Sequence, residues 1–250
     1  MISTTNAALY GKGVFTTISF QNFTPLFWEK HWRRLSLNAG TLDIDISGHD
    51  EPSTRELVIE AIRQFGQSAG RVRVSFLDNS TSEIWGGKAA GTALLSIMTG
   101  PFRDRPPALN LTVSPHRIST TSPLAGVKSC NYLEPLMSLD EARSRGFDEA
   151  IKLNERGEIA SACMANVFWL KGDNLFTPSL RTGCLNGTTR EHILENLECE
   201  EVEISVEALR EADEVFLSSA GLGVVQANDL DGRSLAKRHH KILDLLPKTV

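Results

Sequence analysis

The segment TSPLAGVKSCNYLEPL, Thr121 to Leu136, places a lysine among small and apolar residues. The first acidic side chain after Lys128 is that of Glu134. A lysine in such surroundings either extends its amine to solvent along an apolar surface or has a lowered pKa, which makes the amine a nucleophile. From this segment alone the solvent-directed amine is the default, and a catalytic role needs a second feature elsewhere in the chain.

A second feature is the segment RTGCLNGTTREHI, Arg181 to Ile193, in which a glycine-rich turn leads into two threonines and a helix. Free N–H groups at the start of a helix, with hydroxyls beside them, bind anions such as phosphate. A capped helix after a tight turn explains the same residues without any ligand. Taken together, the lysine and the turn predict a pyridoxal phosphate enzyme, which needs an amine for covalent attachment and an anchor for the phosphate.

Composition narrows the class of protein. The chain has 250 residues, 41% of them hydrophobic, which is enough for one large domain or two small ones. A formal charge of −5 without a long basic run argues against a nucleic-acid partner, and the chain lacks an apolar run of about 20 residues that could span a membrane. The N-terminus has no secretory pattern, and the four cysteines have no metal-ligand spacing. We therefore expect a cytoplasmic protein with free thiols and no metal.

The order of helical and alternating segments predicts an α+β fold. Short strands joined by tight turns outnumber helices, so we expect mixed, mostly antiparallel sheets packed with helices in two layers. The polar segment GPFRDRPPALN, Gly100 to Asn110, is the expected connection between two domains. These are residues 1–105 and residues 106–250, and the second domain carries Lys128.

Three helix ends are predicted from local signals. Thr24 with Pro25 has the pattern of an N-cap followed by the first helical residue. Ser53 and Glu56 have the spacing of a capping box for a second helix. The basic cluster KRHHK, Lys237–Lys241, is expected on the solvent face of a C-terminal helix.

Seven short segments follow one another in order along nearly the whole chain. They are YGKGVFTTI from Tyr10, HWRRL from His31, VKSCNYL from Val127, RGFDEAIKLN from Arg145, GEIASACMANVFWL from Gly157, TPSLRTGCLNGTTR from Thr177 and EVFLSSAGLGVV from Glu214. Together they resemble the motifs of fold-type IV pyridoxal phosphate enzymes, the class IV aminotransferase family. That family includes branched-chain and D-amino-acid aminotransferases and aminodeoxychorismate lyase.

The resemblance implies a cofactor, pyridoxal 5'-phosphate, and a residue-by-residue site. Lys128 would form the Schiff base and transfer protons, Arg34 would bind the phosphate, and Leu185 would pack against the pyridine ring. It also implies an amino-acid-like small-molecule substrate and a homodimer with the active site completed by the neighbouring chain. The implied cofactor-binding residues are Arg34, Lys128, Ser161, Leu185, Gly187, Thr188, Thr189 and Ser219.

One residue departs from the family pattern at the cofactor. The motif GxVxExxxxN has a glutamate where this chain has Ser161, and that glutamate pairs with the pyridine nitrogen and keeps it protonated. A serine can hydrogen-bond the nitrogen but cannot stabilise its positive charge comparably. Glu158 lies three residues earlier, on the other face of a regular strand, and is not expected to replace it. Ordinary transamination is therefore in doubt, and an elimination that needs less ring stabilisation is favoured.

Details of the motifs favour one branch of the family. GVFTTI has a threonine, Thr16, where aminotransferases carry glutamate, and ACMANVFW is similar to the corresponding run of aminodeoxychorismate lyase. That lyase removes pyruvate from 4-amino-4-deoxychorismate and leaves 4-aminobenzoate, a folate precursor. The alternatives are a branched-chain or D-amino-acid aminotransferase and a non-catalytic homologue that binds the cofactor. Candidate partners for the substrate carboxylates are Arg71, Arg73, Arg103, Arg105 and Arg117.

Overall fold

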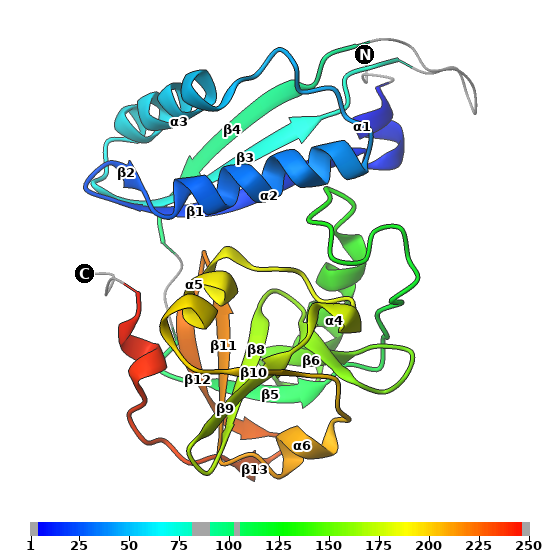
Figure 1. Ribbon diagram of the computed structural model, residues 1–250, viewed down its shortest axis with the longest axis vertical. Helices are drawn as coiled ribbons and strands as arrows, with labels where there is room; N and C mark the ends of the chain where they lie inside the picture. The colour runs from blue at the N-terminus through cyan, green and yellow to red at the C-terminus, as the bar shows by residue number, and fades with distance from the viewer. Residues whose placement is uncertain (1–4, 82–90, 103–105, 247–250) are drawn as a thin grey trace. The chain divides into compact units, whose positions relative to one another are not determined.

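The computed structural model describes residues 5–81, 91–102 and 106–246. The chain divides into two compact units (Figure 1). The first is Met1–Arg103 together with Val127–Tyr132, and the second is Asp104–Gly126 together with Leu133–Val250. The division after Arg103 lies close to the predicted connection, whereas the segment with Lys128 groups with the first unit and not with the second.

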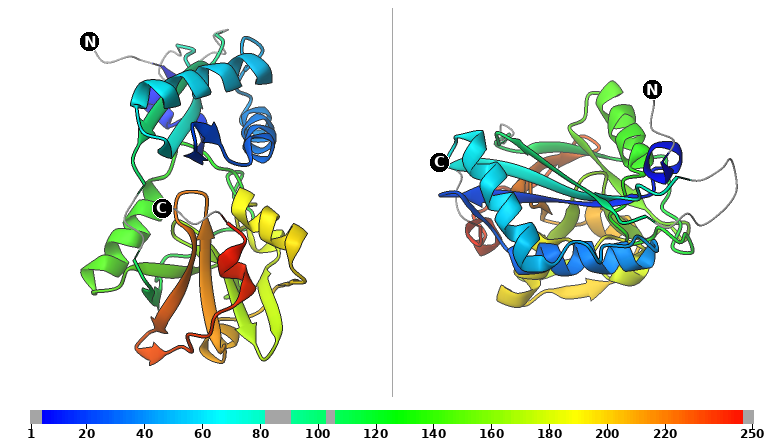
Figure 2. Two further views of the ribbon diagram at one scale, coloured as in Figure 1. Left: turned by 90° about the vertical axis from the view of Figure 1, so that its left-hand side faces the viewer. Right: turned by 90° about the horizontal axis from the view of Figure 1, so that it is seen from above.

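The first unit contains a four-stranded antiparallel sheet in the order β2-β1-β3-β4. Period-two alternation places Val14, Ile18 and Phe20 on one face of β1, and all three are buried. The helices α2 and α3 pack on this face and complete the core (Figure 2). The elements of the first unit are α1 (Asn6–Tyr10), β1 (Gly13–Gln21), β2 (Thr24–Pro25), α2 (Trp28–Thr41), α3 (Glu51–Phe65), β3 (Ala69–Leu77) and β4 (Leu94–Gly100).

The predicted start of the first long helix is wrong. Thr24 and Pro25 form β2, which pairs with the end of β1, and the helix begins only at Trp28. The reason lies in Asn22 and Phe23, which both have positive φ, of 48° and 62°. Two central residues with positive φ form the turn that closes a tight hairpin, and Asn is one of the residues that favours it. The hairpin therefore places Thr24 and Pro25 in a strand.

The second predicted helix is confirmed as α3, but its predicted cap is wrong. Asp50 is the N-cap of α3, and its carboxylate accepts a hydrogen bond of 2.8 Å from the N–H of Ser53. A carboxylate at the N-cap also interacts favourably with the helix dipole. Asp50 is therefore the N-cap, the position predicted for Ser53. The C-terminal end lies at Gly66, whose φ of 77° suits a residue without a Cβ.

The second unit contains a nine-stranded mixed sheet in the order β10-β9-β8-β11-β12-β5-β6-β7, with β13 paired to β12. Most pairs are antiparallel, while β5 runs parallel to both β12 and β6, and β10 runs parallel to β9. The expected α+β fold with mixed, mostly antiparallel sheets is confirmed. The elements are β5 (Leu109–Val113), α4 (Leu133–Ser144), β6 (Glu149–Leu153), β7 (Ile159–Ala162), β8 (Asn166–Lys171), β9 (Asn174–Pro178), η1 (Leu180–Thr182), α5 (Thr188–Asn196), β10 (Glu200–Val202), α6 (Glu207–Arg210), β11 (Glu214–Ser219), β12 (Gly223–Leu230), β13 (Arg233–Ser234) and η2 (Lys241–Asp244).

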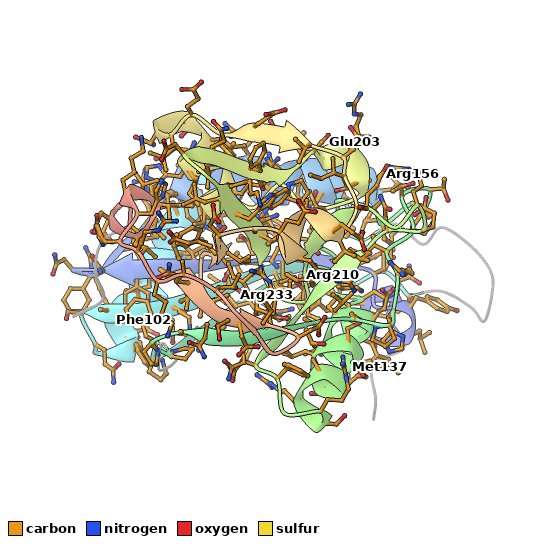
Figure 3. All side chains as sticks on the ribbon, turned by 90° about the horizontal axis from the view of Figure 1, so that it is seen from below. Phe102, Met137, Arg156, Glu203, Arg210 and Arg233 are labelled. Carbon is orange, nitrogen blue, oxygen red and sulfur yellow. The ribbon has the colours of Figure 1, made fainter. Side chains whose placement is uncertain are left out.

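Short elements close the end of the second unit. Arg233 of β13 donates hydrogen bonds to the carbonyls of Leu209 and Ala212 and so ties β13 to the end of α6 (Figure 3). The predicted C-terminal helix is wrong: Lys237–Lys241 has no apolar periodicity, and between residues 237 and 246 the described chain forms only the short 3-10 helix η2, anchored by the buried Ile242. Within the described ranges no helix combines the length and apolar character needed to cross a membrane.

Candidate active site

Lys128 is fixed by the backbone of the first unit. The N–H of Phe15 donates to the carbonyl of Lys128 at 3.0 Å, and the N–H of Cys130 donates to the carbonyl of Gly13 at 2.7 Å. The segment thus runs alongside the start of β1 as an added piece of strand. A Cβ at Gly13 would lie 2.9 Å from the Leu77 side chain, 3.0 Å from the Cys130 sulfur and 3.1 Å from the carbonyl oxygen of Phe76, so glycine favours this close approach.

Aromatic rings surround the amine of Lys128. Its Nζ lies 4.4 Å from the ring centroid of Phe15 and 4.9 Å from that of Tyr132. The two rings meet edge to face, with their centroids 5.2 Å apart. The guanidinium carbon of Arg73 lies 3.6 Å from the centroid of Phe15. One aromatic ring therefore lies close to both the amine of Lys128 and the guanidinium of Arg73, within the range of cation–π contacts.

These surroundings lower the pKa of Lys128 to about 7, first through burial and then through the positive charges of Arg34 and Arg73. A pKa in this range leaves a substantial fraction of the amine neutral near neutral pH, as a nucleophile or general base requires. The solvent-directed amine, the default from the bare segment, does not describe this lysine. Its surroundings are those of a reactive amine.

A hydrogen-bonded chain of α2 and β1 side chains lies next to this lysine. The Oγ1 of Thr16 accepts a hydrogen bond of 2.9 Å from Arg34 and lies 2.6 Å from Nδ1 of His31. Because Arg34 can only donate, Thr16 accepts from it and keeps its own hydroxyl proton, which can be donated to an unprotonated Nδ1 of His31. Burial, Arg34 and Lys128, in that order, lower the pKa of His31 well below its ordinary value, in keeping with a neutral ring. The chain thus positions the guanidinium of Arg34.

The second unit contains a tightly built turn at the start of α5. Gly187 is the N-cap of this helix, and no side chain caps it. A Cβ at Gly187 would lie 2.1 Å from Oδ1 of Asn166, whose Nδ2 donates to the carbonyl of Leu185 at 2.8 Å. Thr188 and Thr189 follow and are each 2% exposed. A glycine turn, helix-start amides and two hydroxyls fit a phosphate group.

The serine pair at the end of β11 has two different environments. Ser219 is partly buried, and its hydroxyl accepts the N–H of Leu222 at 3.2 Å, which is a turn contact. Ser218 is fully buried, and in the described part of the chain its hydroxyl has no hydrogen-bond partner. Ser218 pairs with Asn166 of the neighbouring strand, so the two side chains share a face of the sheet. The residue predicted from the motif is Ser219, whereas the buried hydroxyl of Ser218 is evident only from the structure.

Ser161 lies in β7, directly opposite Lys152 of β6, and is partly buried. Among the described residues its hydroxyl makes no hydrogen bond, which leaves it available to a ligand. Glu158 does not replace the motif's glutamate, because its carboxylate already accepts hydrogen bonds from Asn154 and Arg156.

The arginines proposed as partners of the substrate carboxylates lie in different places. In the first unit Arg73 lies at Phe15, whereas Arg71 donates to the carbonyl of Pro101. Arg103 and Arg105 lie outside the described residues, and Arg117 belongs to the second unit. His31, which is hydrogen-bonded to Thr16, and Lys152, which is buried opposite Ser161, were not among the residues predicted from the sequence. The signal for Lys152 was a single lysine inside the apolar run AIKL.

Residues 13–230 match the model of the family described as amino-transferase class IV. The chain belongs to this family. Family members depend on pyridoxal phosphate, and the relatives are aminotransferases and aminodeoxychorismate lyases. The chain is therefore a pyridoxal phosphate-dependent enzyme, as the seven motifs predict.

The relatives of this class IV enzyme include both activities. It is 28% identical over 240 residues to a putative branched-chain-amino-acid aminotransferase of Methanocaldococcus jannaschii, covering 90% of this chain and 81% of the relative. It is 29% identical over 228 residues to an aminodeoxychorismate lyase of Bacillus subtilis, covering 87% and 77%. The crystal structure of a branched-chain aminotransferase of Thermoproteus uzoniensis with norvaline superposes with a TM-score of 0.90 at 25% identity, covering 98% and 86%. Similarity alone does not separate the two reactions.

Proposed function

We propose that this enzyme is a 4-amino-4-deoxychorismate lyase, which releases pyruvate and leaves 4-aminobenzoate for folate synthesis. The observation that carries the proposal is the charge around Lys128. In the described part of the first unit, the charges that act on its amine are those of Arg34 and Arg73, and both are positive. Thr16 takes the place where aminotransferase motifs have a glutamate, so a neutral hydroxyl joins Arg34 to His31. A cationic site of this kind suits a substrate that carries carboxylates on both of its parts.

The cofactor, when bound, supplies the electron sink that the reaction needs. Lys128 would hold it covalently until the substrate amine takes its place, and the released Lys128 amine would then act as a general base, taking the proton from the substrate ring carbon. As the bond between that ring and the enolpyruvyl oxygen breaks, Lys128 returns a proton to the methylene carbon of the leaving group, which becomes pyruvate. The ring loses one proton and one substituent and becomes aromatic. A pKa of about 7 suits an amine that must both accept and donate a proton near neutral pH.

The remaining residues have binding roles in this proposal. Arg34 binds the phosphate, and the turn at Gly187 with Thr188 and Thr189 supplies amides and hydroxyls. Ser219, with Leu185 against the ring, completes the proposed set. Arg73, which lies beside Lys128 at the ring of Phe15, binds a substrate carboxylate.

A pair of assays on the purified holoenzyme tests the reaction. Release of pyruvate from 4-amino-4-deoxychorismate, without dependence on a keto acid, is the expected result. Amino transfer to 2-oxoglutarate in place of pyruvate release would contradict it and would establish the runner-up, a branched-chain or D-amino-acid aminotransferase. The similarity to the putative branched-chain-amino-acid aminotransferase of Methanocaldococcus jannaschii supports that runner-up. Bound cofactor with neither activity would indicate a non-catalytic homologue.

A matched pair of variants tests the assignment of Arg73. Arg73→Gln should raise KM for the lyase substrate more than it lowers kcat, by about 10-fold or more for loss of a charged hydrogen bond. Arg71→Gln is the control, because Arg71 lies two positions away on β3 and donates to the Pro101 carbonyl. Equal effects of the two changes would remove Arg73 from the substrate site.

Two further parts of the proposal are the homodimer and the cytoplasmic location, which stay predictions. The oligomeric state is measured by light scattering during gel filtration of the holoenzyme. A monomer with full activity would contradict the dimer.

A further inference from the structure

Lys152 is a buried cation in a strand that is otherwise built for a core. It is the fourth residue of β6, in the segment RGFDEAIKLN that resembles the family pattern GxDEALLLD with a leucine at this position, and its side chain is only 3% exposed. A lysine is seldom buried so far without a partner. The partner is Glu134 of α4, whose Oε1 lies 2.6 Å from Nζ of Lys152. Glu134 is 63% exposed, so the acid of this ion pair lies toward water and the cation lies inside.

Lys152 and Ser161 form a cross-strand pair. They are directly opposite in the register of β6 and β7, which places both side chains on one face of the sheet with Cβ atoms about 4.5–5.5 Å apart. Burial and then Glu149 raise the pKa of Cys163, the residue after β7, to about 12, and the charge of Lys152 opposes this rise. At this pair the chain departs twice from the family motifs: an acid is replaced by serine, and an apolar residue opposite it is replaced by lysine.

No other acid of these elements replaces the missing glutamate. Glu149 is buried, and its carboxylate accepts the N–H groups of Ala150, Cys163 and Met164, while burial is the main cause of its raised pKa. Glu134 is already bound to Lys152 from α4, the helix whose outward side chains include the exposed Met137 (Figure 3). The charged and titratable groups of β6 and of the segment after β7, with the acid that binds Lys152, are therefore Glu134, Glu149, Lys152 and Cys163; Glu149 is bound by backbone N–H groups, and Glu134 is held at Lys152 through Oε1.

We propose that Ser161 and Lys152 together replace the family glutamate and hold the pyridine nitrogen of the cofactor in its unprotonated form. The hydroxyl of Ser161 donates a hydrogen bond to the nitrogen, and the buried ammonium of Lys152 disfavours a second positive charge beside it. A neutral ring is a weaker electron sink than a pyridinium, which suits an elimination driven by formation of an aromatic product. The inference rests on the cofactor site of the proposed function and not on the identity of the reaction.

The test is nitrogen NMR of the holoenzyme with cofactor labelled by ¹⁵N in the pyridine ring. The wild-type resonance should be that of a neutral pyridine across the neutral pH range. The variant Lys152→Met keeps the length and apolar stem but removes the charge, and its resonance should titrate toward the pyridinium position at higher pH than in the wild type. The double variant Lys152→Met with Ser161→Glu should show the pyridinium resonance at neutral pH. Lys171→Met is the control, since Lys171 is exposed in the neighbouring strand β8 and binds the Glu211 carbonyl.

A pyridinium resonance in the wild-type enzyme at neutral pH would overturn the inference, and this measurement needs no variant to fold. An unchanged resonance in Lys152→Met would assign the neutral ring to Ser161 alone and overturn the role of Lys152. A neutral ring in an enzyme that fails to release pyruvate would contradict the lyase proposal only. Failure to retain labelled cofactor would overturn both.

Discussion

The Lys128 group of the first unit and the Gly187 turn of the second unit are built on different physical grounds. Around Lys128, reactivity comes from burial and the positive charges of Arg34 and Arg73, which together lower the amine pKa. Around Gly187, the chain offers backbone amides in a turn so close that any Cβ would meet Asn166. The first region lowers the proton affinity of the Lys128 amine, and the second holds backbone amides in a fixed arrangement.

The difference separates two kinds of sensitivity. A change of charge near Lys128 alters which protonation state is populated and so alters chemistry, while the fold around it can remain. A change of shape at Gly187 moves the amides themselves and so alters binding. If both regions serve one cofactor, variants in the first should affect rate more than cofactor affinity, and variants in the second should do the reverse.

Replacement of the lysine is the strongest test of the chemical side. Lys128→Met should lower the rate of product formation by about 10⁴-fold or more, because covalent attachment and proton transfer are both lost. Borohydride reduction of the wild-type holoenzyme followed by peptide mapping should place the pyridoxyl group on Lys128. In Lys171→Met, which changes an exposed lysine of β8, the rate and the labelled peptide should be those of the wild type. A pyridoxyl group on any other lysine would remove Lys128 from the centre of the site.

How much of this was visible in the sequence depends on the range of the interaction. Lys128 and the turn at Gly187 belong to contiguous motifs, so both were predicted from short runs of residues. The choice of Arg73 over Arg71 needed the strand pairing that brings Arg73 to Phe15. The ion pair of Lys152 with Glu134 joins a strand to a helix that sequence periodicity does not align.

Local signals failed where a stronger neighbour competed. Thr24 and Pro25 have a good helix-start pattern, yet the turn at Asn22 and Phe23 places them in a hairpin. Asp50 caps α3 in place of Ser53, because a carboxylate binds the free helix-start N–H groups more strongly than a hydroxyl. Helix propensity is a weak guide to where a helix begins, since a single turn in the preceding residues can move the helix start along the chain.

The lowered pKa of Lys128 predicts a pH-dependent cost to the apoprotein. In the unfolded chain the amine has its ordinary pKa of 10.5, and in the folded chain the pKa is about 7. The unfolded state therefore binds the proton more tightly, and the destabilisation is complete below about pH 7 and is released as pH rises toward about 10.5. Relative to Lys128→Met, the wild-type apoprotein should gain several degrees in unfolding midpoint between about pH 6 and about pH 9.

Calorimetry of the two apoproteins at several pH values measures this gain. The lowered pKa of His31 also makes the folded state less stable as pH falls, but it is present in both proteins and largely cancels in the difference. A difference in midpoint that does not vary with pH would mean that Lys128 keeps an ordinary pKa. The reactive amine of the first region would then need another cause.

The smallest expected effect is that of a substitution in the turn at Gly187. In Gly187→Ala the new Cβ would lie 2.1 Å from Oδ1 of Asn166, so the turn or the Asn166 side chain must shift. Overpacking of this kind costs about 1–3 kcal/mol. If the cost falls on the bound form, cofactor affinity should drop about 5- to 150-fold, as measured by equilibrium dialysis. The control Gly40→Ala lies in α2 with no heavy atom within 4 Å of the new Cβ and should leave the affinity unchanged.

Saturating cofactor should restore most of the rate in Gly187→Ala and none in Lys128→Met. Weaker binding at the turn is compensated by a higher cofactor concentration, whereas a missing amine is not. Equal responses of the two variants to added cofactor would mean that binding and chemistry are not divided between these regions.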